Sequence, residues 1–174
     1  ICVRLVGSEM CIRDRDNETI RSFNHIRDDW DDRGDKNSFT IDFDGNSKVA
    51  YGFTVSLGDS LADATYTNGN SESKDWDGDW IARTFKGDNF WSSEFFIPWT
   101  VVPMQKVDGP KRNVKFIAFR WLASDEYGFG STKTNWERET FIYDLEDLVI
   151  DNYQSKKYSY FPYLTVAKDS VTKE

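Results

Sequence analysis

Residues 38–57 constrain the fold most, because apolar and polar residues alternate there in two consecutive runs. The first run covers residues 38–44, in which Phe39 begins a series of inward positions, and the second covers residues 48–57. A period of two residues is typical of β-strands that are buried on one face. The link Asp44-Gly-Asn-Ser47 contains residues that tolerate a positive φ. We therefore expect a β-hairpin.

The rest of the chain contains further strand patterns and no long window of helix-forming residues. Residues 113–123 carry apolar side chains on both faces, which predicts a central strand covered from both sides. By contrast, residues 60–79 and the Gly-rich segment 127–130 are expected to be loops, the first with one short strand at 62–66. The other expected strands are residues 80–85 and 89–97, which form a second hairpin, then 145–150 and 158–166. These patterns predict an all-β fold, an antiparallel β-sandwich.

The charge and the apolar pattern exclude two classes of protein. The formal net charge is −8, which argues against a nucleic-acid partner, because phosphate binding needs clustered Lys and Arg. No apolar run approaches the roughly 18 residues that a membrane helix requires. The composition fits a secreted or surface protein as well as a cytosolic one.

The first fifteen residues resemble the translated adaptor sequence that contaminates environmental assemblies, and they lack the order of regions found in a signal peptide. We interpret residues 1–15 as an artefact and the native N-terminus as missing, so that the sandwich is truncated there. Both cysteines, Cys2 and Cys11, lie in this segment. The alternative is a genuine N-terminal strand over residues 1–6.

Residues for catalysis are scarce. His25 is the only histidine, which leaves little material for a His-based triad or a zinc site. Acidic residues are plentiful, but no spacing marks two of them as a glycosidase pair. We therefore predict a protein that is not an enzyme.

Four segments in order resemble family 9 carbohydrate-binding modules. They are residues 38–44, residues 51–57, the Trp-x-x-x-Trp motif at Trp76 and Trp80, and Glu94-Phe-Phe-Ile-Pro-Trp99. The resemblance implies a β-sandwich over residues 16–150 that binds a mono- or oligosaccharide. Such a module would serve as an accessory domain of a polypeptide involved in carbohydrate breakdown.

The tail resembles the junction to a C-terminal β-barrel in bacterial outer-membrane proteins. The resemblance is carried by Leu145-Glu-Asp-Leu-Val-Ile150 and Phe161-Pro-Tyr-Leu-Thr-Val166. It implies that residues 151–174 are a linker and the first strand of a membrane barrel in the same chain. The protein would then lie in the periplasm, the outer membrane or at the cell surface of a bacterium. An ordinary edge strand of the sandwich is the open alternative.

Sugar-binding members of the family hold a terminal sugar between two tryptophans. By position the resemblance implies Trp30 and Trp136 as the carbohydrate-binding pair, with Arg138 in the same segment as Trp136. Where those members place a Glu and an Arg, this chain has Thr40 and Thr54. The missing charges favour a second hypothesis, a structural or interaction domain attached to the barrel and without a sugar site.

Two further sets of residues were considered for ligands. Asp75, Asp77 and Asp79 offer three carboxylates within five residues, which suits Ca²⁺, although a solvated acidic turn is the commoner reading of such a cluster. The five remaining tryptophans are expected to pack in the core or at its rim. They are Trp76, Trp80, Trp91, Trp99 and Trp121.

Overall fold

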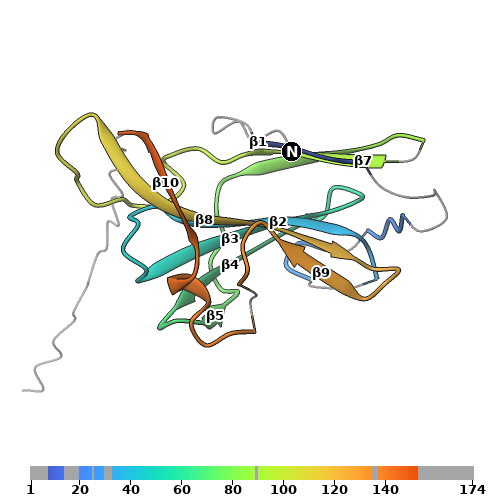
Figure 1. Ribbon diagram of the computed structural model, residues 1–174. Coiled ribbons are helices and arrows are strands. Elements are labelled where there is room, and N and C mark those ends of the chain that lie inside the picture. Colours follow the sequence, from blue (N-terminus) through green and yellow to red (C-terminus); the bar gives the residue numbers. More distant parts are fainter. Residues whose placement is uncertain are drawn as a thin grey trace, which may run out of the picture.

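The protein is an antiparallel β-sandwich of a three-stranded and a seven-stranded sheet, as predicted (Figure 1). The computed structural model describes residues 8–13 (backbone only), 20–24, 26–29, 33–88, 90–134 and 137–152. The smaller sheet has the order β1 (Ser8–Arg13), β7 (Phe90–Phe96), β6 (Ile81–Lys86). The larger sheet has the order β10 (Glu146–Asp151), β8 (Lys111–Leu122), β2 (Lys36–Asp42), β3 (Val49–Ser56), β4 (Leu61–Thr67), β5 (Ser71–Ser73). The seventh strand, β9 (Tyr127–Gly130), pairs with the end of β8, on the same edge of β8 as β10.

The predicted hairpin is formed by β2 and β3, which pair with Phe39 opposite Phe53. The turn is built on the Asp42 carboxylate, which accepts hydrogen bonds from the backbone N–H groups of Asp44, Gly45 and Ser47 at 3.0, 2.9 and 2.6 Å. Gly45 has a φ of +63°, and a Cβ at this position would lie 2.7 Å from the carbonyl oxygen of Asn113. Local sequence therefore fixes both the turn and the register of the hairpin.

The core lies between the two sheets, on one face of each strand. Phe39 and Phe53 of the larger sheet meet Phe95 and Trp80 of the smaller one. The Phe39 and Phe95 rings pack edge to face at 4.9 Å, and Trp80 stacks on Phe95 at 5.9 Å. Each such side chain contributes about 1.5–3 kcal/mol through its burial. The prediction that Trp76, Trp80, Trp91 and Trp99 pack in the core or at its rim is confirmed.

A buried polar group interrupts this apolar core. Asp35 and Arg120 are both 1% exposed, and their side chains lie 4.0 Å apart. The Arg120 guanidinium also lies over the Trp91 ring, 5.0 Å from its centroid. The alternation of Glu94 with Phe95 in the sequence leaves open an inward Glu94 that pairs with Arg120 or Arg83. In the structure Glu94 is exposed and lies opposite Arg83, and the buried positions of β7 are Trp91, Ser93 and Phe95.

Two expected loops contain strands. The polar segment 60–79 forms β4 and β5, joined by a turn at Asn68 and Gly69, both of which have a positive φ. The Gly-rich segment is β9, because its backbone pairs with residues 119–122 of β8. Glycine weakens strand propensity, but pairing with a long neighbouring strand overrides it here.

The segment interpreted as an artefact supplies β1, which pairs with β7 along residues 8–13. An open strand edge accepts another strand through backbone groups alone, so the pairing itself requires no particular side chains. The edge strand or barrel strand expected at 158–166 lies outside the described residues. Within the described ranges, no helix has the length and apolar character needed to cross a membrane.

Among the described residues, η1 and its neighbours cover one end of the outer face of the larger sheet, the face that points away from the smaller sheet. The short 3₁₀ segment η1 (Phe141–Tyr143) packs Phe141 and Ile142 against Tyr66 and Ile117 there. The backbone N–H of Ile142 donates to the carbonyl of Gly69, which ties η1 to the β4–β5 turn. In the described part of the chain, the prediction that β8 is covered on both faces is therefore confirmed at this end alone.

Candidate functional site

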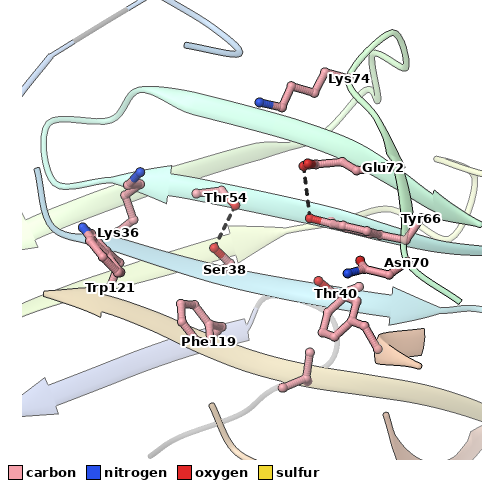
Figure 2. A pocket seen from close by; sticks show the side chains of 13 residues that line it. Lys36, Ser38, Thr40, Thr54, Tyr66, Asn70, Glu72, Lys74, Phe119 and Trp121 are labelled. Atoms are coloured by element: carbon pink, nitrogen blue, oxygen red, sulfur yellow. Dashed lines mark hydrogen bonds between the residues drawn. The ribbon is translucent and has the colours of Figure 1, made fainter. Parts of the chain in front are cut away.

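A groove of about 450 Å³ lies on the outer face of the seven-stranded sheet, beside η1 (Figure 2). Its position follows from strand alternation. The core residues of β2 and β3 point toward the smaller sheet, so the residues between them point outward. Strands of this kind present two independent surfaces. The outer surface is hollow because the outward side chains of β2 and β3 are small.

The floor of the groove consists of small residues from β2 and β3. Ser38 lies opposite Thr54 and Thr40 lies opposite Gly52 in the register of these strands. The hydroxyl oxygens of Ser38 and Thr54 form a hydrogen bond at 2.8 Å. A Cβ on Gly52 would lie 3.0 Å from Cε2 of Tyr66, so the glycine leaves room for that ring. Small hydroxyl side chains in the middle of a sheet leave a depression that is lined with hydrogen-bonding groups.

One wall of the groove is apolar and belongs to β8. Ile117, Phe119 and Trp121 alternate along this strand and line the groove. Phe119 and Trp121 are half-buried, and Trp121 lies directly opposite Lys36 of β2. This wall explains why β8 is apolar on both faces: one face packs in the core and the other lines the groove. An aromatic wall of this kind can hold the apolar face of a ligand ring.

The opposite side of the groove is polar. Tyr66, Asn70, Glu72 and Lys74 come from β4, β5 and the residues around them. Figure 2 shows the Tyr66 hydroxyl directed at Glu72, to which it donates a hydrogen bond at 3.4 Å. The groove thus combines an aromatic wall with hydroxyl, amide, carboxylate and ammonium groups, which is the mixture found in small-molecule sites.

Burial, and then the nearby carboxylate of Glu72, raise the pKa of Tyr66 well above its ordinary value of 10.0. Both causes disfavour the phenolate, since a buried charge is poorly solvated and lies beside a like charge. The hydroxyl therefore stays protonated and acts as a hydrogen-bond donor at physiological pH.

This shift predicts a loss of stability at alkaline pH. Above pH 10 the unfolded chain ionises this tyrosine while the folded chain does not, so the free energy of unfolding falls as the pH rises. Between pH 9 and pH 11, urea unfolding should show a loss that is smaller by about 1.4 kcal/mol in Tyr66→Phe than in the wild type. Between pH 7 and pH 9 the two proteins should show the same dependence. Equal losses between pH 9 and 11 would contradict the shift.

The predicted carbohydrate-binding residues lie in different parts of the structure. Trp30 and Trp136 are outside the described residues. Arg138 lies in the segment that leads into η1, and its guanidinium pairs with the Asp144 carboxylate at 3.0 Å rather than lining the groove. Thr40 and Thr54, the positions where the resemblance would place a Glu and an Arg, both line the groove.

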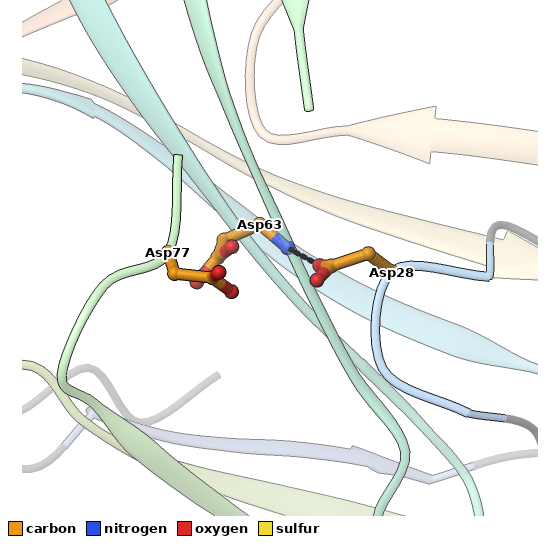
Figure 3. Close-up of side chains that lie close together, drawn as sticks. All are labelled: Asp28, Asp63 and Asp77. Carbon is orange, nitrogen blue, oxygen red and sulfur yellow. Dashed lines mark hydrogen bonds between the residues drawn. The ribbon is translucent and has the colours of Figure 1, made fainter. Parts of the chain in front are cut away.

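The predicted calcium ligands are not gathered at one point. The Asp75 carboxylate accepts a hydrogen bond from the Ser73 hydroxyl at 3.1 Å, and Asp79 is exposed. In the described part of the chain, the three carboxylates that approach within 4.8 Å of one another are Asp28, Asp63 and Asp77 (Figure 3). A positive side chain of the chain itself lies among these carboxylates.

Arg27 is that side chain, and its one positive charge offsets part of the negative charge of the three carboxylates. Its guanidinium binds the Asp63 carboxylate, and its Nε lies 3.2 Å from Asp77 and 3.6 Å from Asp28. Asp63 in turn accepts hydrogen bonds from the Trp80 indole N–H at 2.6 Å and from the Gly78 backbone at 3.1 Å. The cluster therefore joins the loop before β2 and the loop before β6 to strand β4.

The most informative groove residue, Trp121, was expected to pack in the core or at its rim. The sequence does contain a signal for it, which is the second apolar face of residues 113–123. A strand that is apolar on both faces can be covered by another layer or can line a groove, and only the strand order distinguishes these cases.

Comparisons of the chain with protein-family models, with curated proteins and with solved structures find no match. The resemblance to family 9 carbohydrate-binding modules therefore rests on the residues quoted above and stays a prediction.

Proposed function

We propose that the chain is a non-catalytic carbohydrate-binding module of a larger secreted or outer-membrane bacterial protein, and that it binds sugar in the groove on the seven-stranded sheet. The observation that carries the proposal is the lining of this groove. An aromatic wall of Phe119 and Trp121 faces hydroxyl groups on the floor and polar side chains on the far side. A pyranose ring offers an apolar face to the first and hydroxyl groups to the second.

The same lining supports a binding role rather than hydrolysis. Glycoside hydrolysis needs two carboxyl groups about 5–10 Å apart on either side of the bond that breaks. Among the described residues that line the groove, Glu72 is the one carboxylate, and it accepts the hydroxyl of Tyr66. A single carboxylate engaged in this way suits recognition of hydroxyl groups.

Trp121→Ala should weaken sugar binding about 10- to 30-fold, because a stacked aromatic ring contributes roughly 1.5–2 kcal/mol through the area it buries. The measurement is calorimetric titration with mono- and oligosaccharides, after circular dichroism has shown that the variant is folded. Phe85→Ala is the matched control, since Phe85 is an exposed aromatic residue of the smaller sheet and its loss should leave the affinity unchanged. Unchanged affinity in Trp121→Ala would refute the groove as the site. The same titration of Trp136→Ala tests whether the segment before η1 contributes.

A second candidate function is an interaction domain that docks onto another part of the same polypeptide. It is favoured by the outer face of the three-stranded sheet, on which Ile81, Phe85 and Phe96 are 56%, 62% and 48% exposed. Apolar residues that gather on an exposed face mark interaction surfaces. Silence across the sugar panel from a folded protein would favour this function over the first.

A further inference from the structure

We propose that the groove recognises saccharides by two adjacent hydroxyl groups of one sugar unit, a vicinal diol, both of which donate hydrogen bonds to the Glu72 carboxylate beside the Tyr66 hydroxyl. This inference rests on the proposed carbohydrate-binding function and adds the class of ligand and the residue that selects it. It begins with the acceptors that the lining offers to a sugar hydroxyl.

Glu72 is the strongest acceptor for a sugar hydroxyl in the described lining. It is the one carboxylate there, and a hydrogen bond to an ionised acceptor is roughly twice as strong as one to a neutral group. The hydroxyl groups of Ser38 and Thr54 on the floor already bond one another at 2.8 Å, a distance typical of a well-formed O–H···O hydrogen bond. A ligand hydroxyl therefore gains most at Glu72.

The Glu72 carboxylate has acceptor sites beyond the one that Tyr66 uses. An ionised carboxylate offers about four such sites on its two oxygens. The Tyr66 hydroxyl donates to Oε1 at 3.4 Å, which is longer than the roughly 2.5–3.0 Å of a well-formed O–H···O bond. Glu72 is an exposed residue of β5, so a ligand in the groove can reach both oxygens. Two adjacent ligand hydroxyls can then bond the carboxylate at once.

Tyr66 is held in place beside this carboxylate. Its ring packs edge to face against Phe141 with the centroids 5.2 Å apart, and the residue is 9% exposed. Gly52 leaves the room that the ring occupies, since a Cβ there would lie 3.0 Å from Cε2 of the tyrosine. Because the hydroxyl stays protonated, its proton is directed at Glu72 and its oxygen can accept from the ligand. Groups that are placed in advance bind a ligand with a smaller loss of entropy.

The diol site and the aromatic wall suit successive units of an oligosaccharide. Phe119 lies opposite Ser38 of β2, whereas the Tyr66 ring lies against Gly52, which is opposite Thr40. These two levels are two residues apart along β2, or roughly 7 Å at about 3.3 Å per residue. A unit stacked on Phe119 therefore places its neighbour toward the Tyr66 hydroxyl (Figure 2). An oligosaccharide with an unsubstituted diol on that neighbouring unit makes both contacts.

The test compares cellotriose, xylotriose and β-1,4-mannotriose with the same trisaccharides methylated at every O2 and O3. In calorimetric titration, each trisaccharide that binds should bind at least about tenfold more tightly than its ether, since an ether oxygen accepts hydrogen bonds but donates none. Glu72→Gln should weaken binding of the free trisaccharide about tenfold and remove most of the preference over the ether. Glu94→Gln is the matched control, because Glu94 is exposed on the smaller sheet, and it should change neither affinity.

Tyr66→Phe distinguishes direct contact between Glu72 and the ligand from a role of Glu72 in holding Tyr66. This variant removes the hydroxyl that bonds the carboxylate. Adding Glu72→Gln to Tyr66→Phe should weaken binding by a further factor of about five or more, because the carboxylate itself meets the ligand. A double variant that binds as tightly as Tyr66→Phe would show that Glu72 acts only through Tyr66, and the proposal would fail.

Two other outcomes would overturn the inference, and a third separates it from the proposed function. Equal binding of a trisaccharide and its ether would refute recognition of a diol and leave the carbohydrate-binding function intact. Unchanged affinity in Glu72→Gln, folded as judged by circular dichroism, would refute the assignment to Glu72. Binding of no saccharide by the folded wild type would refute both proposals.

Discussion

Asp35→Ala should lower the free energy of unfolding by about 3–5 kcal/mol, the loss expected when one partner of a buried ion pair is removed. Asp35 and Arg120 are both 1% exposed and their side chains lie 4.0 Å apart, so the variant would remove a buried carboxylate from beside a buried guanidinium. The Asp35 carboxylate also accepts the backbone N–H of Ala123 at 3.0 Å, and this donor would lose its partner. Urea unfolding at pH 7 measures the change, which should appear as a lower midpoint with an unchanged slope.

Two further variants make this result specific. Asp151→Ala removes an exposed partner of the exposed Lys111 and should leave the urea midpoint almost unchanged, because water screens this pair. The double variant Asp35→Ala/Arg120→Met should be more stable than Asp35→Ala alone, because it also removes the buried positive charge. A double variant that is less stable than the single one would show that Arg120 stabilises the core without its partner.

Asp63→Ala should cost about 3–4 kcal/mol, since it removes the acceptor of several charge-assisted hydrogen bonds at once. Asp63 is fully buried and accepts hydrogen bonds from the Trp80 indole and the Gly78 backbone, as well as from Arg27. Without the carboxylate, the indole N–H would be left buried in the core with no acceptor. Urea unfolding, followed by the fluorescence of the buried tryptophans, provides the measurement.

The control for this prediction is Asp77→Ala, which removes an exposed carboxylate from the same cluster. Its pair with Arg27 is open to solvent, so the variant should lose less than about 1 kcal/mol. Asp63→Asn should fall between the two, because its amide oxygen can still accept from Trp80. Similar losses in Asp63→Ala and Asp77→Ala would show that the cluster stabilises by its total charge and not by the hydrogen bonds of Asp63.

Local patterns predicted the all-β class and the hairpins, because alternation and turn residues act within a few positions of one another. The β2–β3 hairpin follows from Asp42 and Gly45, which lie within its own turn. Strand β5 was not predicted because its three polar residues carry no alternation, and they become a strand only by pairing with β4.

The groove could not be predicted from local patterns, because it depends on which face of each strand is covered. Trp121 and Lys36 come together only because β8 pairs with β2 across a long stretch of chain. The Asp35–Arg120 pair likewise depends on the pairing of β2 with β8, since Asp35 precedes β2 and Arg120 lies in β8. The sequence shows that β8 has two apolar faces, but the order of the strands decides their environments.

Residues of β2 and β3 alternate between the two faces of the sheet, so substitutions on one face can accumulate without changing the residues of the other. Odd-numbered positions such as Phe39 and Phe53 pack in the core, whereas even-numbered ones such as Thr40 and Thr54 line the groove. Chains that share this fold would therefore keep apolar residues at the first set and vary the second freely as their ligands change. An inserted residue within β2 would exchange the two sets, so length variation among such chains should be confined to the turns.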